Sequence, residues 1–248
     1  MEPVYRTIIG LARTVFFVEG LKFTVQGAEN IPRSGGAVLA VNHTGYMDFT
    51  YAGLPVRTPK RYIRFMAKKE VFDNAISGPI MRALKHIPVD RGAGADSYQA
   101  AVEYLRRGEL VGVYPEATIS RSFEIKEFKS GAARMALEAD VPLVPIVIWG
   151  AQRVWTKGFP KRLGRTNTPI SIAVGKPIQP YEPAADLTAE LRATMQKLLL
   201  ELQEDYVHEP GAYWVPARLG GSAPTLEEAD AMDAAEIAER AAKRKSAE

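Results

Sequence analysis

Residues 35–48 read GGAVLAVNHTGYMD, the stretch that indicates the fold most directly. Two glycines precede the short apolar run 37–41, which is typical of a buried β-strand. His43 and Asp48 follow at once, where a strand gives way to a loop or to the start of a helix. Polar side chains in that position are typical of α/β proteins, whose sites form at the carboxyl ends of strands.

Strand-like and helix-like segments alternate along the rest of the chain. Because of this alternation, the sequence predicts a single α/β domain with a mostly parallel or mixed sheet flanked by helices. Asp96 is the expected N-cap of one helix, and Gly108 is its expected stop. The expected strands are residues 37–41, 61–67, 87–89, 109–116, 141–150 and 169–175, and the expected helices are 76–84, 96–107, 130–139 and 187–207.

The two ends of the chain differ from this central part. Residues 1–25 are apolar but are interrupted by Arg6, Arg13 and Glu19, which makes a membrane span costly. Their spacing predicts an amphipathic helix, and taken alone it slightly favours packing on the protein's own core over lying in a membrane surface. The domain is expected over residues 26–215, followed by a tail, 216–248, that is helical or poorly ordered and loosely attached.

Composition excludes several kinds of site. The 248 residues contain no cysteine, so disulfides, thiolate metal sites and cysteine nucleophiles are excluded. The three histidines, His43, His86 and His208, lack partners at metal-ligand spacing, so no metal site is expected. The net charge is only +3, which gives no indication of nucleic-acid binding.

His43 and Asp48 form the sharpest chemical pattern. A carboxylate five positions after a histidine can meet its ring where the chain turns into a helix. The carboxylate would orient the imidazole and stabilise its charged form, and the other ring nitrogen would take a proton from a hydroxyl as a general base. If that hydroxyl belongs to the substrate, no protein nucleophile is needed. Alone, this spacing is a weak signal, since a histidine near an aspartate is more often structural.

Three further segments carry weaker signals. YPEAT at residues 114–118 ends an apolar strand, with Arg121 just beyond it. IPVDRG at residues 87–92 places an arginine beside a glycine, where a forked donor and accessible backbone can meet a phosphate. VPIVI at residues 144–148 is an apolar strand with an internal proline. Each of these alone is more often a loop, a surface arginine or a core strand.

Taken in order, the four blocks resemble those of the 1-acylglycerol-3-phosphate O-acyltransferase family, within the glycerolipid acyltransferase superfamily. NHTGYMD is similar to the family's NHxxxxD block, and IPVDRG to its second block. YPEAT is similar to the third block, commonly written FPEGT, and VPIVI to the fourth. The resemblance covers residues 36–149 and extends less distinctly to residue 207.

The resemblance implies an O-acyltransferase that moves an acyl group from acyl-CoA or an acyl carrier protein to lysophosphatidic acid, giving phosphatidic acid for phospholipid biosynthesis. It implies no metal and no bound cofactor. His43 and Asp48 are the expected catalytic pair. Substrate binding is expected of Asn42, Thr44, Lys68, Arg91, Gly92, Glu116, Ala117, Thr118 and Arg121.

Two departures from the family pattern affect the acceptor more than the reaction class. Ala117 stands where the family usually has glycine, and Ile119 stands where an arginine often follows the threonine, with Arg121 as a candidate replacement. Other acceptors therefore stay open, namely glycerol 3-phosphate, a lysophospholipid or a glycolipid. Hydrolysis of acyl-CoA and a non-catalytic lipid-binding or acyl-CoA-binding membrane module are further alternatives.

The resemblance also implies a place in the cell. Acceptor and product are both lipids, so the active site is expected to open at a bilayer. The N-terminal segment then becomes an interfacial helix, and the protein a monotopic or peripheral one on the cytoplasmic face of the cell membrane. The expected partners are the lipid acceptor, the acyl donor and the membrane surface, without nucleic acid.

Overall fold

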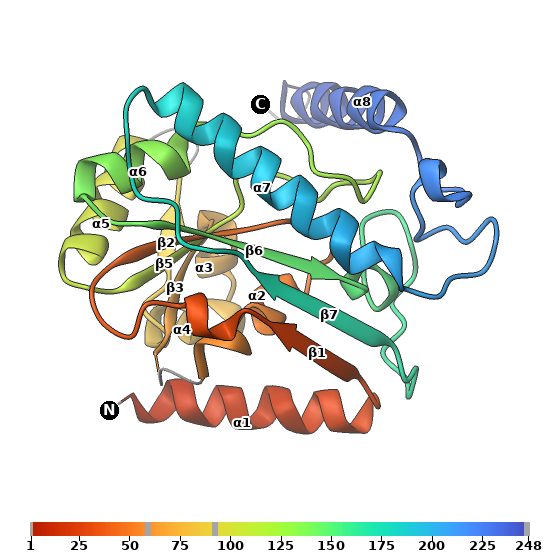
Figure 1. Cartoon of the computed structure of the whole chain (residues 1–248), viewed down its shortest axis with the longest axis horizontal. Coiled ribbons are helices and arrows are strands. Elements are labelled where there is room, and N and C mark those ends of the chain that lie inside the picture. The colour runs from red at the N-terminus through yellow and green to blue at the C-terminus, as the bar shows by residue number, and fades with distance from the viewer. Residues whose placement is uncertain (1, 58–60, 91–93, 246–248) are drawn as a thin grey trace.

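Seven strands form one sheet in the order β1-β7-β6-β2-β5-β3-β4 (Figure 1). The computed structural model describes residues 2–57, 61–90 and 94–245. Neighbouring strands are parallel except β6 and β7, so the predicted α/β class with a mostly parallel, mixed sheet is confirmed. The strands are β1 (Lys22–Gln26), β2 (Ala37–Val41), β3 (Ile63–Lys68), β4 (Ile87–Val89), β5 (Leu110–Val113), β6 (Leu143–Trp149) and β7 (Pro169–Val174).

Helices cover both faces of the sheet, as Figure 1 shows. The α5, α6 and α7 helices lie on one face, and α1 lies on the other. The helices are α1 (Pro3–Val18), α2 (Asp48–Tyr51), α3 (Lys69–Asp73), α4 (Ser77–Ala83), α5 (Gly94–Arg106), α6 (Gly131–Ala139), α7 (Ala184–Glu204) and α8 (Leu226–Lys245).

The β2 strand lies inside the sheet and is buried along its whole length. Successive side chains of a strand point to opposite faces, and β2 uses both. Val38 and Ala40 pack into the core beneath α5, α6 and α7, whereas Leu39 and Val41 pack into the core that contains Phe16 of α1. A strand with two apolar faces has no solvent side, which explains its continuous apolar sequence.

The N-terminal segment is a helix followed by a strand. The sequence assigns residues 1–25 to one helical segment, but α1 ends at Val18. The backbone of Gly20 then adopts a left-handed conformation (φ +69°), which glycine reaches without strain, and the chain enters β1. Because β1 pairs in parallel with β7, the end of the predicted segment belongs to the sheet.

The α1 helix packs with one face on the domain. Phe16 is buried against the rings of Phe23 and Tyr51, with centroids 5.2 and 5.3 Å away. At the start of α1, the Glu2 carboxylate pairs with the buried Arg64 guanidinium at 2.5 Å. No helix in the described part of the chain combines the length and apolar character that a bilayer span requires.

The predicted helices are present, although some of their first and last residues differ from the prediction. The α5 helix begins at Gly94, so Asp96 lies in its first turn and is not its N-cap. Gly108 does end the helix: its φ is +84°, and its N–H bonds to the carbonyl of Leu105. The α7 helix begins three residues before the predicted start at residue 187.

The C-terminal tail forms the α8 helix and contacts the domain. The sequence predicts a loosely attached tail because residues after Gly220 are only weakly apolar. Their attachment is ionic instead: Asp233 is 9% exposed and lies 2.6 Å from Lys126. Apolar content alone therefore could not predict this contact.

The contact between β5 and β3 leaves no room for a side chain at Gly112. A Cβ atom there would lie 2.6 Å from ring carbons of Phe65 and 2.7 Å from Ile63. We expect Gly112→Ala to lower the free energy of unfolding by about 1–3 kcal/mol, because these side chains must move. Gly10→Ala, in open space on α1, should instead raise it by about 0.5–1 kcal/mol. Equal urea-unfolding midpoints for the two variants would contradict this packing.

Candidate active site

The site lies where β2 and β5 end side by side. These strands are parallel, so the loops that follow them emerge at the same edge of the sheet. His43 comes two residues after β2, and Glu116 comes three residues after β5. The register of two strands thus brings together motifs that lie some 70 residues apart in the sequence.

His43 and Asp48 are in direct contact. Nδ1 of His43 lies 3.0 Å from Oδ2 of Asp48. The Asp48 side chain is fully buried, whereas the His43 side chain is 20% exposed. The same Asp48 oxygen also accepts the backbone N–H groups of Thr44 at 2.8 Å and Gly45 at 2.9 Å. An ionised carboxylate only accepts hydrogen bonds, so His43 donates from Nδ1, and Nε2 is the nitrogen that can take a proton.

The loop after β5 holds His43 from three sides. The backbone N–H of His43 donates to Oε1 of Glu116 at 2.8 Å, and its carbonyl accepts the N–H of Ser120 at 2.7 Å. The Tyr114 ring stacks on the imidazole, with centroids 4.1 Å apart. The position of the imidazole is therefore set by its own strand, by Asp48 and by this loop.

Glu116 is buried and bonds to the backbone of both loops. Its second oxygen accepts the N–H of Lys126 at 3.1 Å. Burial raises the pKa of Glu116 to about 7, although the hydrogen bonds from the His43 and Lys126 backbones favour the ionised form. Both oxygens thus join protein segments, whereas the sequence predicts that this side chain shapes the acceptor site.

Asn42 and Thr44 flank the histidine and are also buried. The Asn42 amide makes two hydrogen bonds to the backbone of Ile148, donating at 3.0 Å and accepting at 2.7 Å. The hydroxyl of Thr156 donates to the Thr44 carbonyl at 2.6 Å. The Asn42 side chain therefore joins β2 to β6.

Ala117 adopts the backbone conformation that explains the family's usual glycine. Its φ is +62°, inside the left-handed region, in a tight turn closed by its N–H and the carbonyl of Tyr114. A Cβ atom in this region crowds the following carbonyl. The substitution of alanine for glycine therefore keeps the turn at a cost in strain.

Thr118 and Arg121 contact α8. The Arg121 guanidinium pairs with Asp233 at 3.1 Å and with Glu236 at 2.8 Å. The Thr118 hydroxyl donates to Oδ2 of Asp233 at 3.4 Å and accepts from Nζ of Lys126 at 3.1 Å. Arg121, the candidate replacement for the missing arginine, is thus paired with carboxylates of the protein itself.

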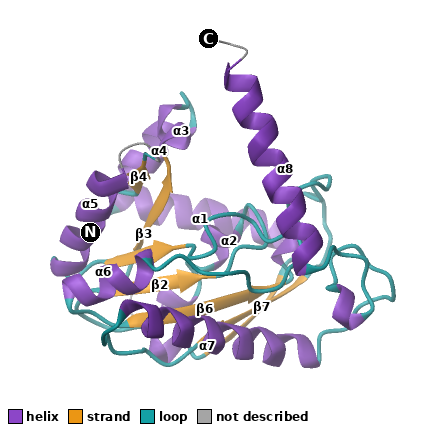
Figure 2. Cartoon of the chain, turned by 90° about the horizontal axis from the view of Figure 1, so that it is seen from above, coloured by secondary structure: helices purple, strands orange, loops and turns teal. Residues whose placement is uncertain are grey.

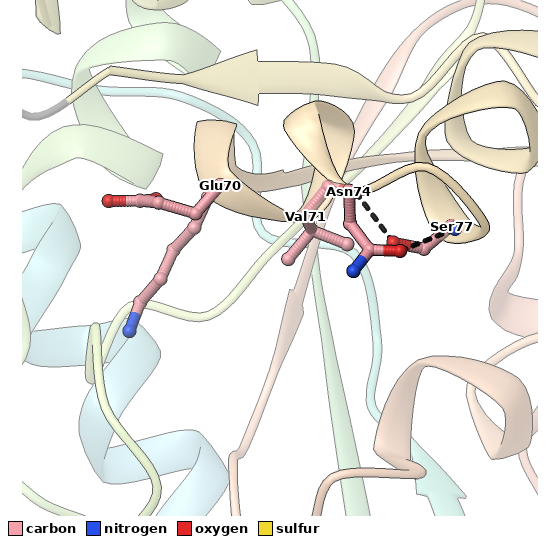
Figure 3. Close-up of a pocket in the computed structure, with 5 residues that line it drawn as sticks. Glu70, Val71, Asn74 and Ser77 are labelled. Carbon is pink, nitrogen blue, oxygen red and sulfur yellow. Dashed lines mark hydrogen bonds between the residues drawn. The ribbon is translucent and has the colours of Figure 1, made fainter.

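Lys68 lies at the end of β3 and lines a cavity that His43 does not line. This open cavity of about 440 Å³ is lined by Lys68, Glu70, Val71, Asn74 and Ser77, and not by His43. Figure 3 shows Asn74 and Ser77 bonding within this cavity, where the Asn74 side chain accepts the N–H of Ser77 at 3.1 Å. Arg91 and Gly92 lie outside the described residues.

An apolar groove approaches the imidazole through a series of aromatic rings. Phe49 and Phe65 line the groove between α1 and the sheet, together with Ile8, Ala12, Phe16 and Leu54. The Phe65 ring lies 6.3 Å from that of Phe49 and 6.0 Å from that of Tyr114, which stacks on His43. Tyr114 belongs to a predicted motif, but nothing in the sequence indicates that it stacks on the histidine.

The fold and site define an α/β enzyme with a histidine oriented by a buried carboxylate, an arrangement suited to acyl transfer. The acyltransferase family model matches residues 22–149, just over half of the chain, and the chain belongs to that family. The resemblance seen in the four sequence blocks is thereby confirmed at the family level.

Named relatives and a solved structure are similar to this chain. A 1-acyl-sn-glycerol-3-phosphate acyltransferase of Bacillus subtilis is 28% identical over 187 residues, covering 72% of this chain and 87% of the relative. One from Limnanthes douglasii is 29% identical over 62% of this chain and 54% of its own length, so the chain spans about half of that plant protein. The crystal structure of the LPA acyltransferase PlsC from Thermotoga maritima shares the fold, with a TM-score of 0.66 at 22% identity over 82% of this chain and 81% of that one.

The strain at Ala117 predicts a stabilising substitution. We expect Ala117→Gly to raise the free energy of unfolding by about 0.5–1 kcal/mol, since relief of left-handed strain outweighs the added freedom of the unfolded chain. Ala193→Gly, at an exposed position inside α7, should lower it by about 1 kcal/mol. Urea unfolding of both variants checks the prediction, and a loss of stability in Ala117→Gly would refute it.

The raised pKa of Glu116 predicts a pH-dependent stability. A folded-state pKa of about 7, above the usual 4.5, means that the folded protein holds this proton more tightly than the unfolded chain. The contribution of Glu116 is therefore fully present below pH 4.5 and is lost as the pH rises through 7. Glu116→Gln removes this titration. We expect the stability advantage of the wild type over Glu116→Gln to shrink across that range in urea unfolding, and an advantage that grows with pH would contradict the assignment.

Proposed function

We propose that this acyltransferase moves an acyl group from a thioester to the free hydroxyl of lysophosphatidic acid, giving phosphatidic acid for phospholipid biosynthesis. The contact between His43 and Asp48 carries the proposal, because it sets an imidazole to remove a proton from an alcohol. The names of relatives in bacteria and plants, 1-acyl-sn-glycerol-3-phosphate acyltransferases, support this acceptor.

In the proposed reaction, His43 acts as general base and Asp48 orients it. Nε2 takes the hydroxyl proton while the alcohol oxygen attacks the thioester carbonyl carbon. The tetrahedral intermediate then collapses, the carbon–sulfur bond breaks, and the imidazolium returns the proton to the leaving sulfur. The buried Asp48 carboxylate stabilises the transient imidazolium through Nδ1. Acid–base catalysis of this kind contributes typically about 10²–10⁴-fold to the rate.

The apolar groove beneath α1 is the proposed path of the acyl chain. Most of its lining side chains are aliphatic or aromatic, although Arg13, Arg57 and Arg61 also line it. The rings of Phe65 and Tyr114 connect it to His43. Burial of methylene groups stabilises a bound chain by about 0.8 kcal/mol each. Acyl-CoA or an acyl carrier protein is the proposed donor, and no bound cofactor is invoked.

Cations near the loops are proposed to bind the acceptor. Arg91 with Gly92, Lys68 and Arg121 would bind the phosphate of the acceptor, as the sequence blocks imply. Glu116, with Ala117 and Thr118, acts through the backbone of the loop that positions His43. Holding the acceptor hydroxyl near Nε2 accounts for much of the proposed catalysis, because well-oriented groups react far faster than free ones.

The exposed face of α1 is proposed to lie in the membrane surface. Phe17 is 80% exposed, Leu11 and Val18 are each 62% exposed, and Val4 and Val15 are also exposed. A water-exposed face of this kind suits the headgroup boundary of a bilayer, with Arg6 and Arg13 near lipid phosphates. The enzyme is then monotopic or peripheral, on the cytoplasmic face of the cell membrane.

The proposed catalytic pair predicts a large loss of activity when either side chain is changed. We expect His43→Ala to lower kcat for acylation of lysophosphatidic acid by at least about 10²-fold, and Asp48→Asn by a similar order, since each removes base catalysis. His208→Gln, which changes a histidine outside the site, is the control and should keep its activity. Phosphatidic acid is measured by mass spectrometry with circular dichroism as a check of folding, and retained turnover in His43→Ala would reject the mechanism.

The proposed membrane face predicts a change of partitioning. We expect Leu11→Ser combined with Phe17→Ser to reduce binding to lipid vesicles severalfold, since both side chains are exposed and Phe16 keeps α1 packed on the domain. Leu200→Ser, at a 52% exposed position of α7, is the matched control. Vesicle co-sedimentation measures the effect, and equal binding by all three proteins would show that another surface contacts the bilayer.

A further inference from the structure

Three cations converge on two largely buried carboxylates of α8, Asp233 and Glu236, and the exposed Asp230 lies 3.9 Å from Lys126. Asp233 pairs with Lys126 at 2.6 Å, Lys157 at 2.9 Å and Arg121 at 3.1 Å. Glu236 pairs with Lys157 at 2.5 Å and Arg121 at 2.8 Å. Apart from Asp230, none of these side chains is more than 22% exposed. Because these charged side chains are largely buried, leaving any one of them unpaired would cost free energy.

Two of the three cations, Arg121 and Lys126, belong to the loop that positions the proposed catalytic histidine, and Lys157 lies in the loop between β6 and β7. Arg121 follows Ser120, whose N–H bonds to the His43 carbonyl. The backbone N–H of Lys126 bonds to Glu116, which in turn accepts the N–H of His43. Whatever anion binds these cations therefore contacts the same loop that fixes the imidazole.

The charges of the cluster match those of a phosphate site. Arg121 and Lys126 lie within residues 22–149, the range matched by the family model, whereas Asp233 and Glu236 lie on a helix beyond it. A phosphomonoester carries about −1.5 to −2 charges and three acceptor oxygens, and guanidinium and ammonium groups are its usual ligands. The two carboxylates of α8 thus supply the charge that one such group would supply.

The N-terminal cap of α8 does not depend on the rest of the domain. The helix starts with a self-contained capping box, in which Thr225 accepts the N–H of Glu228 and Glu228 accepts the N–H of Thr225. Ala229 and Asp233 are the buried side chains of α8 among the described residues. Figure 2 shows α8 running outward from the loops, with its last turns away from the sheet. The ion cluster is therefore its principal attachment to the domain.

We propose that Arg121, Lys126 and Lys157 form a phosphate-binding site, and that α8 covers it with Asp233 and Glu236 until a lipid phosphate displaces them. The inference rests on the proposed function, since the phosphate belongs either to the acceptor or to headgroups of the bilayer. The α8 helix is then an acidic cap, and it lowers the apparent affinity of the site. A site covered about nine-tenths of the time binds its ligand roughly tenfold more weakly than an open one.

The ionisation of Asp233 fits this role. Burial opposes its charge, yet the hydrogen bonds from Lys126 and Lys157 outweigh burial and lower the pKa of Asp233 to about 2. The carboxylate therefore stays ionised at neutral pH. A phosphate therefore has to compete with a charged group for the same three cations.

The first test measures whether phosphate moves α8. The chain has no cysteine, so spin labels at Ile237→Cys on α8 and Leu200→Cys on α7, both exposed, report one distance. We expect a single distance without lipid and a longer, broader distribution with phosphatidylcholine vesicles that carry lysophosphatidic acid. Vesicles carrying phosphatidylglycerol at equal surface charge identify the source: displacement by both lipids assigns bilayer headgroups, and displacement by lysophosphatidic acid alone assigns the acceptor.

The second test compares two variants that should both release α8 but should change vesicle binding in opposite directions. Asp233→Asn with Glu236→Gln should release α8 and strengthen binding to lysophosphatidic acid vesicles roughly tenfold, because the competing anion is gone. Lys157→Gln should also release α8 but weaken binding. Glu227→Gln with Asp205→Asn, both at exposed positions, is the charge-matched control for the double variant, and Lys197→Gln, at an exposed position of α7, is the control for Lys157→Gln.

These outcomes separate the cap from a purely structural contact. If the contact were purely structural, Asp233→Asn with Glu236→Gln and also Lys157→Gln would release α8 and bind vesicles more weakly, and that result would overturn the proposal. A spin-label distance on α8 that no lipid changes would overturn it as well. Vesicle binding and the label distance are measured in the wild type and in His43→Ala. Neither measurement needs turnover, so the two tests still decide this proposal if the proposed acyl transfer fails.

Discussion

The arrangement of the site depends on one buried oxygen. Oδ2 of Asp48 accepts hydrogen bonds from the backbone of Thr44, the backbone of Gly45 and the ring of His43, all within 3.0 Å. Two backbone donors stabilise this oxygen, and the third bond, from Nδ1 of His43, fixes the imidazole. Because a carboxylate only accepts, the bond also decides which ring nitrogen carries the proton. A turn of six residues thus sets both the position of the imidazole and its tautomer.

The sheet gives this turn its fixed surroundings. The Asn42 amide joins the end of β2 to β6 through Ile148, and Glu116 joins the loop after β5 to the backbone of His43. Both side chains are buried, and both bond to backbone groups. Asn42 and Glu116, which the sequence assigns to substrate binding, therefore also hold the backbone around His43 in place.

The sequence predicts the fold class and the contact between His43 and Asp48 because both depend on local patterns. Apolar strands alternate with helices, and His43 and Asp48 lie only five residues apart, so one turn brings them together. Contacts across large separations were not predictable. The stacking of Tyr114 on His43 depends on the register of β2 and β5, and the pairing of Arg121 with Asp233 joins residues 112 apart. Propensity and spacing contain no information about either of these contacts.

The most direct measurement of the central claim is the tautomer of His43, observed by nitrogen-15 NMR of the imidazole at neutral pH in the full-length protein. The bond to Asp48 predicts a neutral ring protonated at Nδ1, with Nε2 unprotonated, and loss of this preference in Asp48→Asn. A neutral ring protonated at Nε2 in the wild type would contradict the account, because the nitrogen that must accept the substrate proton would already carry one.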